Sequence, residues 1–126
     1  MLTSVVDPVY SGAFAELVAP LPPAVVELTA RLVALIAAHP GLDGKVMAGW
    51  KSVNFRQPAA GHVCSVFPQP DRVTLYFEHG RLLEHGHGLL VGDGLKRGRY
   101  LRLAVGADLP LDRIGILLSE AIALFA

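Results

Sequence analysis

Hydrophobic positions recur at helical spacing in two segments, one near each end of the chain. In the first segment, residues 24–38, apolar side chains follow the period of an α-helix and surround most of its circumference. Pro22 and Pro23 precede it, where a first helical turn tolerates proline, and Pro40 with Gly41 ends it. We therefore expect a helix that is heavily buried or shared with a partner.

The second helical segment follows Asp108 and carries one uninterrupted apolar stripe. Asp108 is expected to cap this helix, and Asp112 lies in its first turn, where the helix dipole favours negative charge. The stripe consists of Ile114, Leu117, Leu118, Ala121, Ile122 and Phe125. The pattern predicts a terminal helix that packs this stripe against a core.

Between the helices the hydrophobic period changes to two, which is typical of half-buried strands. In residues 72–78, Val73, Leu75 and Phe77 alternate with polar side chains. Three further strands are expected at residues 50–56, 62–67 and 99–105. The order predicts an α+β fold, in which an antiparallel sheet (a three-strand meander plus a fourth strand) packs with N- and C-terminal helices. Residues 21–126 would form this single domain and residues 1–20 an N-terminal arm.

Composition and charge narrow the class of protein. A chain of 126 residues has the usual size of one domain. It is 52% hydrophobic and only 17% charged, against about 25% charged in an average globular domain, so a homodimer that covers apolar surface is expected. Eleven basic residues balance eleven acidic ones. Without an overall positive field, nucleic acid is not an expected partner.

No membrane segment or secretory signal is expected. The longest apolar stretch, residues 19–38, is interrupted by prolines, Glu27 and Arg31, whereas a membrane helix needs about 20 apolar residues. Residues 1–10 lack the positive charge of a secretory signal. The single Cys64 has no partner for an internal disulfide. These features predict a cytoplasmic protein without a membrane anchor.

Side chains able to bind metal gather in the connection that follows residue 77. Imidazole and carboxylate groups together suit zinc or iron. Each histidine here is followed by glycine, which is equally typical of turns with exposed imidazoles. The sequence therefore allows two interpretations of these residues, a metal site or a turn-rich connection. The residues are Glu78, His79, Glu84, His85 and His87.

A basic cluster with interspersed glycines follows in the same connection. Its backbone amides and cations could cradle an anion, although a solvated turn is the alternative. Trp50, together with Tyr76 and Tyr100, could line a pocket for a flat or anionic ligand, or it could belong to the core. The candidate ligand-binding residues are Trp50, Lys51, Lys96, Arg97, Arg99 and Tyr100.

His62 and Cys64 are two residues apart on an expected strand. They should share a face, which is the minimum for a thiolate–imidazole pair; a buried cysteine beside an edge histidine is the alternative. The sequence contains no evident paired carboxylates, serine elbow or nucleotide fingerprint. An enzymatic function is therefore not favoured.

Several segments, taken in order, resemble the YdhG-like family of bacterial domains, most of whose members have no assigned function. They are PLPPAVVELTARLVALI, GWKSVNF, RVTLYFEHGRLL and LLVGDGLKRGRYLRL, followed by the terminal helix after Asp108. The resemblance covers about Leu21 to Leu124. It implies an α+β fold similar to that of frataxin, because one branch of the family includes a frataxin-like iron chaperone.

Two functions follow as hypotheses. The first is a non-enzymatic accessory protein that binds a small ligand or anion and needs no cofactor. The second, implied by the resemblance, is a chaperone for iron or another metal that uses residues 78–87. Frataxin-type proteins hold iron on a carboxylate-rich first helix, whereas Glu27 is the only acidic residue in the first helix expected here. This difference favours the first hypothesis.

Overall fold

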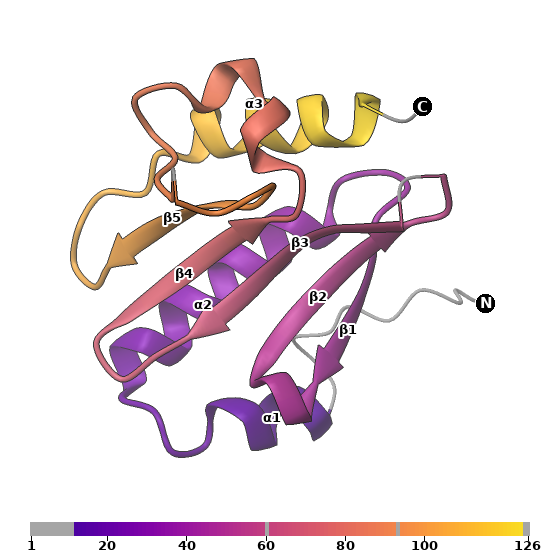
Figure 1. Cartoon of the computed structure of the whole chain (residues 1–126). Coiled ribbons are helices and arrows are strands. Elements are labelled where there is room, and N and C mark those ends of the chain that lie inside the picture. Colours follow the sequence, from indigo (N-terminus) through magenta and orange to yellow (C-terminus); the bar gives the residue numbers. More distant parts are fainter. Residues whose placement is uncertain (1–11, 60, 93, 125–126) are drawn as a thin grey trace.

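The computed structural model describes residues 12–59, 61–92 and 94–124, which form an α+β fold. Within these residues a five-stranded antiparallel sheet follows the chain order: β1 (Asp43–Met47), β2 (Ser52–Gln57), β3 (Gly61–Pro68), β4 (Arg72–Phe77) and β5 (Arg99–Ala104). The α-helices are α1 (Gly12–Val18), α2 (Pro23–Ala37) and α3 (Leu111–Ala123). The predicted α+β class and antiparallel sheet are confirmed (Figure 1).

The expectation of four strands is wrong, because β1 adds a fifth. β1 pairs with β2 at the edge of the sheet, with Lys45 opposite Asn54 and Val46 opposite Val53. None of its five side chains is buried, and its sequence, DGKVM, contains no alternation of apolar and polar residues. Backbone pairing holds this strand, and the hydrophobic pattern therefore could not reveal it.

Part of the segment expected to be an arm is a helix that joins the core. In α1, Phe14 and Val18 are only 4% and 7% exposed and belong to the main hydrophobic cluster. These contacts begin two residues into the described chain. Residues 1–11 lie outside the described residues.

Helix α3 begins later than the sequence suggested. Its N-cap residue is Pro110, so the expected cap at Asp108 is wrong, although Asp112 lies in the first turn as predicted. The expected stripe faces the core: Ile114, Leu117, Leu118 and Ala121 are buried and Ile122 is partly buried. Phe125, the last member of the predicted stripe, lies outside the described residues.

Helix α2 lies against one face of the sheet, behind β3 and β4 in the view of Figure 1. Its buried residues are Val25, Leu28, Thr29, Leu32, Val33 and Ile36. They pack with Val73, Leu75 and Phe77, the apolar positions of β4, which are fully buried as the alternation predicted. None of the described helices is long and apolar enough to span a membrane.

The opposite face of the sheet is not covered by any α-helix of the described residues (Figure 1). Arg72, Thr74 and Tyr76 of β4 point to this side and are only partly buried, in alternation with the core residues. We call this surface the open face. Its side chains are available to a ligand, so this surface is a candidate functional site.

The open face of the sheet as a candidate ligand site

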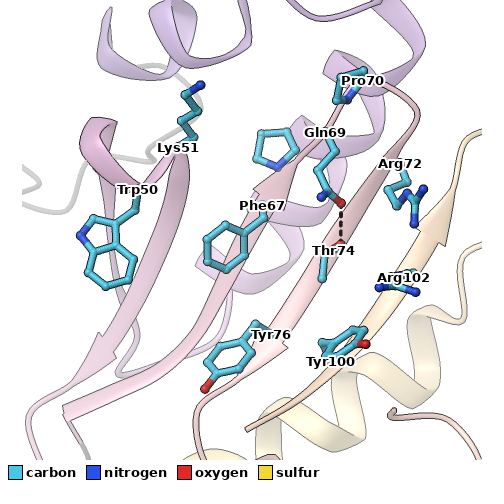
Figure 2. Close-up of a pocket in the computed structure, with 11 residues that line it drawn as sticks. Trp50, Lys51, Phe67, Gln69, Pro70, Arg72, Thr74, Tyr76, Tyr100 and Arg102 are labelled. Carbon is cyan, nitrogen blue, oxygen red and sulfur yellow. Dashed lines mark hydrogen bonds between the residues drawn. The ribbon is translucent and has the colours of Figure 1, made fainter. Parts of the chain in front are cut away.

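A hollow of about 610 Å³ lies on the open face, near the end of the sheet at which the β1–β2 and β3–β4 turns both lie (Figure 2). Its aromatic lining consists of Trp50, Phe67, Tyr76 and Tyr100, and its basic lining of Lys51, Arg72 and Arg102. Pro68, Gln69, Pro70 and Thr74 complete it. The hollow thus combines flat apolar surfaces with positive charge.

Strand register brings the lining residues together. Tyr76 of β4 is the direct partner of Tyr100 of β5, and Thr74 is the partner of Arg102. Phe67 of β3 pairs with Thr74 from the other side. Because neighbouring strands lie only about 5 Å apart, these side chains form a continuous surface across three strands.

Trp50 and Lys51 enter the site from a tight turn. Trp50 ends the 3-10 helix Ala48–Trp50, and Lys51 follows it in the left-handed region, with φ 55° and ψ 46°. Trp50 is 70% exposed, so it is not a core residue. The Lys51 side chain extends from the rim towards the turn end of the sheet, while the Trp50 ring lies over the face (Figure 2). A non-glycine residue in this conformation is strained, a feature that concentrates at functional sites.

Arg102 and Arg72 supply the positive charge inside the hollow, but they are not equivalent. The Arg102 guanidinium carbon lies 5.1 Å from the centroid of the Tyr100 ring, in a cation–π contact. Arg72 forms two hydrogen bonds, of 3.1 and 3.2 Å, with the carboxylate of its neighbour Asp71. Arg102 is therefore the cation better able to bind an added anion.

Tyr76 is held in place at the centre of the open face. Its hydroxyl donates a hydrogen bond of 3.0 Å to Glu78 Oε1. Burial, followed by this hydrogen bond to Glu78, raises the pKa of the Tyr76 phenol. Gly98 lies against the ring, where any side chain would overlap it. The hydrogen bond to Glu78 and the contact with Gly98 thus set the position of the ring.

The other three residues of the predicted ligand-binding set lie outside this lining. Arg99 Nη1 donates hydrogen bonds to the carbonyl oxygens of Leu95 and Gly98, at 3.1 and 2.7 Å. Arg97 Nη2 lies 3.8 Å from Glu78 Oε2, and Lys96 is exposed. The structure therefore brings together Trp50, Lys51 and Tyr100 but not Lys96, Arg97 and Arg99.

The residues considered for a metal site are spread along the connection between β4 and β5. Glu78 accepts from Tyr76, His79 is half-buried, and Glu84, His85 and His87 are exposed. His85 and Glu84 belong to the 3-10 helix Glu84–Gly86, and the 3-10 helix Gly80–Leu82 precedes it. In residues 12–59, 61–92 and 94–124, no three His, Cys, Asp or Glu side chains group in a way that could hold a metal ion.

A carboxylate from α3 holds the 84–86 turn instead. Glu120 accepts hydrogen bonds from the backbone N–H groups of Glu84 and His85, at 2.7 and 3.1 Å, and lies 3.0 Å from His85 Nδ1. Burial opposes ionisation of Glu120, but the hydrogen bonds from His85 and Glu84 outweigh it and lower the pKa of the Glu120 carboxyl. This contact ties the loop to the terminal helix.

His62 and Cys64 do not pair. The register of β3 shifts at this point, because Phe55 is opposite Cys64 while Arg56 is opposite His62, so Val63 is an extra residue. Cys64 lies in the core, where burial raises the pKa of its thiol. His62 Nε2 instead lies 2.9 Å from Ser65 Oγ. The thiolate–imidazole alternative is therefore wrong, and the buried cysteine is the correct reading.

Sequence reasoning missed Phe67, Arg72, Thr74 and Arg102 as site residues. The signal was present, because Arg72, Thr74 and Tyr76 occupy alternate positions of one strand and Tyr100 and Arg102 do so on the next. The basic cluster in the sequence grouped Arg97 with Arg99 because they are close in the chain. Adjacent residues of a strand point to opposite faces of the sheet, whereas residues of different strands that point to the same face form one surface.

No family model matches the chain, and no curated protein or solved structure matches it at a significant level. The YdhG-like assignment remains an expectation drawn from the sequence.

Proposed function

We propose that this protein is a non-enzymatic binding domain that holds a small, flat anion on the open face of its sheet. The observation that carries this proposal is that exposed Trp50, the paired rings of Tyr76 and Tyr100 and the cation Arg102 all line one hollow. Its volume of about 610 Å³ lies within the range of about 300–1,000 Å³ that is usual for small-molecule sites. Aromatic faces receive a flat ring, and a guanidinium group binds carboxylate or phosphate.

Arg102 is suited to binding an anion because it places a positive charge at the site itself. The chain has no net charge, so a distant field does not attract the ligand. Among the described residues, the ion pairs recorded involve Arg72, His85 and Arg97 but not Arg102. Packing on Tyr100 limits the conformations of the guanidinium, which lowers the entropy cost of binding an anion.

Trp50 provides a direct test, because it is the only tryptophan in the chain and lies in the hollow. Titration with phenyl phosphate should produce a saturable change in tryptophan fluorescence. Phenol and inorganic phosphate, which each carry only one half of that ligand, should bind more weakly. Circular dichroism of every variant should confirm that the fold is intact.

Arg102→Met keeps much of the apolar stem but removes the charge. It should raise the dissociation constant for phenyl phosphate at least about fivefold, since a charge-assisted hydrogen bond contributes about 1.5–3 kcal/mol. Arg113→Met is the matched control, because Arg113 is an exposed residue of α3 outside the hollow. Equal titrations for the wild type and Arg102→Met, or no saturable change at all, would overturn the proposal.

The alternative is a metal-handling protein of the frataxin-like kind. The observation in its favour is that Glu84, His85 and His87 are exposed within four consecutive residues. Iron or zinc at a hundredfold excess over its dissociation constant would stabilise the fold by about 2.7 kcal/mol. That effect should disappear in a His85→Ala/His87→Ala double variant and persist in Arg102→Met, which separates this function from anion binding.

We further propose that the chain has the YdhG-like, frataxin-like fold. The order of elements, a helix followed by antiparallel strands and a final helix, supports this proposal.

A cytoplasmic homodimer is also proposed. Its support is the group of exposed apolar side chains, which includes Leu82, Val91 and Leu95 before β5 and Leu111 and Ile116 on α3. Light scattering at micromolar concentration should give twice the monomer mass, and a single monomeric species would contradict it.

A further inference from the structure

The open face continues beyond the first hollow. A second hollow of about 410 Å³ shares Trp50, Phe67 and Tyr76 with the first. It adds four hydrogen-bonding residues, which are Asn54, His62, Ser65 and Glu78. The two hollows form one trough, and its chemistry changes from one end to the other.

The direction of the trough follows β4. Arg72, Thr74 and Tyr76 occupy alternate positions facing the trough, and Glu78 follows directly after the strand. Arg102 lies level with Thr74 by register, and Glu78 is four residues further on, about 13 Å at the usual rise of about 3.3 Å per residue. Positive charge therefore lies at the turn end, aromatic rings lie in the middle, and a carboxylate lies at the far end.

The far end can still form hydrogen bonds with a ligand. Glu78 Oε1 accepts from Tyr76, and among the described residues the ion-pair partner of Oε2 is Arg97, at 3.8 Å, which is beyond hydrogen-bond distance. Asn54 Oδ1 accepts from Ser52 at 2.7 Å, which leaves its amide N–H groups as donors towards the trough. A carboxylate acceptor and an amide donor therefore both line this hollow, one on each side of β3.

His62 does not add a positive charge there. Burial is the main cause that lowers the pKa of its imidazole, against the opposing effect of Glu78, so the ring is neutral at pH 7. Its Nε2 lies beside the Ser65 hydroxyl at 2.9 Å. Arg102 attracts an anionic group at the turn end, whereas Glu78, which Arg97 offsets only in part at 3.8 Å, disfavours one at the far end, so one orientation of the ligand is favoured.

From this order of groups we infer that the ligand is a free mononucleotide with an amino-bearing base. This inference rests on the proposed anion-binding function. The phosphate binds at Arg102, the base stacks on Tyr76, Phe67 and Trp50, and its amino edge donates to Glu78. A single nucleic-acid strand is disfavoured, because it needs a longer track of cations than the neutral chain offers.

Purine riboside monophosphate provides the control ligand, because it has the phosphate, ribose and purine ring but neither an exocyclic amino group nor an N1–H donor. Guanosine or adenosine monophosphate should quench Trp50 fluorescence with a dissociation constant at least about fivefold lower than that of purine riboside monophosphate, as expected for a hydrogen bond to a charged acceptor. Glu78→Gln should remove this preference while the protein still binds phenyl phosphate. Glu27→Gln, at an exposed position of α2, is the matched control and should keep the preference.

The outcomes separate this inference from the proposed function. If phenyl phosphate binds through Arg102 but the three mononucleotides bind equally well, or no better than phenyl phosphate, the nucleotide inference is wrong and anion binding stands. If no aromatic anion binds, both are wrong. If a short single-stranded oligonucleotide binds far more tightly than its mononucleotide, the ligand is a nucleic acid and the free mononucleotide is ruled out.

Discussion

Gly98 lies directly against the phenol ring of Tyr76, and a Cβ at residue 98 would overlap the outer atoms of that ring. The glycine is not needed for an unusual backbone conformation, since its φ is not in the left-handed region. It is needed for space. The residue before β5 thus fixes the position of the ring on which the ligand is proposed to stack.

Gly98→Ala should therefore reduce binding much more than stability. The outer end of a tyrosine can swing away at small cost, so we expect less than about 1 kcal/mol of lost stability. The displaced ring loses its hydrogen bond to Glu78 and its place in the hollow, and affinity for phenyl phosphate should fall severalfold. Gly94→Ala is the control, because a Cβ there meets nothing within 4 Å. Equal affinities for the two variants would contradict this account.

A second prediction concerns the strained backbone of Lys51. Both Lys51→Ala and Lys51→Gly remove the same charge, but only glycine adopts φ 55° without a steric cost. In denaturant unfolding, the glycine variant should be more stable than the alanine variant by about 1 kcal/mol. If alanine is equally stable, the left-handed conformation is not a source of strain.

A third prediction concerns the core. Leu118 is fully buried in α3, and Leu118→Ala should cost about 2–5 kcal/mol, from lost transfer free energy and the cavity that remains. Ile116→Ala on the same helix is the control, since Ile116 is 47% exposed and should change stability by less than about 0.5 kcal/mol. Denaturant unfolding of both variants would measure these changes in the free energy of unfolding. Similar losses for the two variants would show that α3 is packed differently.

The fourth prediction is a pH dependence at Glu120. The pKa of the Glu120 carboxyl in the folded protein is below the ordinary value of 4.5. The stabilisation of the fold by the ionised carboxylate is therefore fully present above about pH 4.5 and is lost as the pH falls through the lowered pKa. Glu120→Gln should cost about 1 kcal/mol at pH 7, a modest amount because the site is partly solvent-screened. The difference from the wild type should shrink on acidification to pH 3. A difference that stays constant with pH would contradict the ionic role of Glu120.

The sequence predicted those elements whose burial is regular. β4 was visible because Val73, Leu75 and Phe77 alternate with polar residues, and α3 because its stripe has a helical period. β1 was not visible, because an edge strand with no buried side chain leaves no hydrophobic pattern. The bulge at Val63 was also invisible, since it depends on how β3 pairs with β2.

The site was predicted only in part, for a related reason. Trp50 and Lys51 lie about fifty residues before Tyr100 in the chain, and only strand order and register bring the three to one surface. The charge cluster before β5 suggested Arg97 and Arg99 because they are close in sequence. Residue 99 lies out of phase with Tyr100 on the strand, whereas Arg102 lies in phase, and that alternation decides which arginine faces the ligand.

Cys64 has a practical consequence beyond its place in the core. It is the only cysteine of the chain and is fully buried at the centre of β3. A thiol reagent can reach it only when the sheet separates from α2, so the rate of its modification measures the opening of the native state, without an added probe. Ligand bound on the open face should slow that reaction in proportion to its affinity, although it never touches the sulfur.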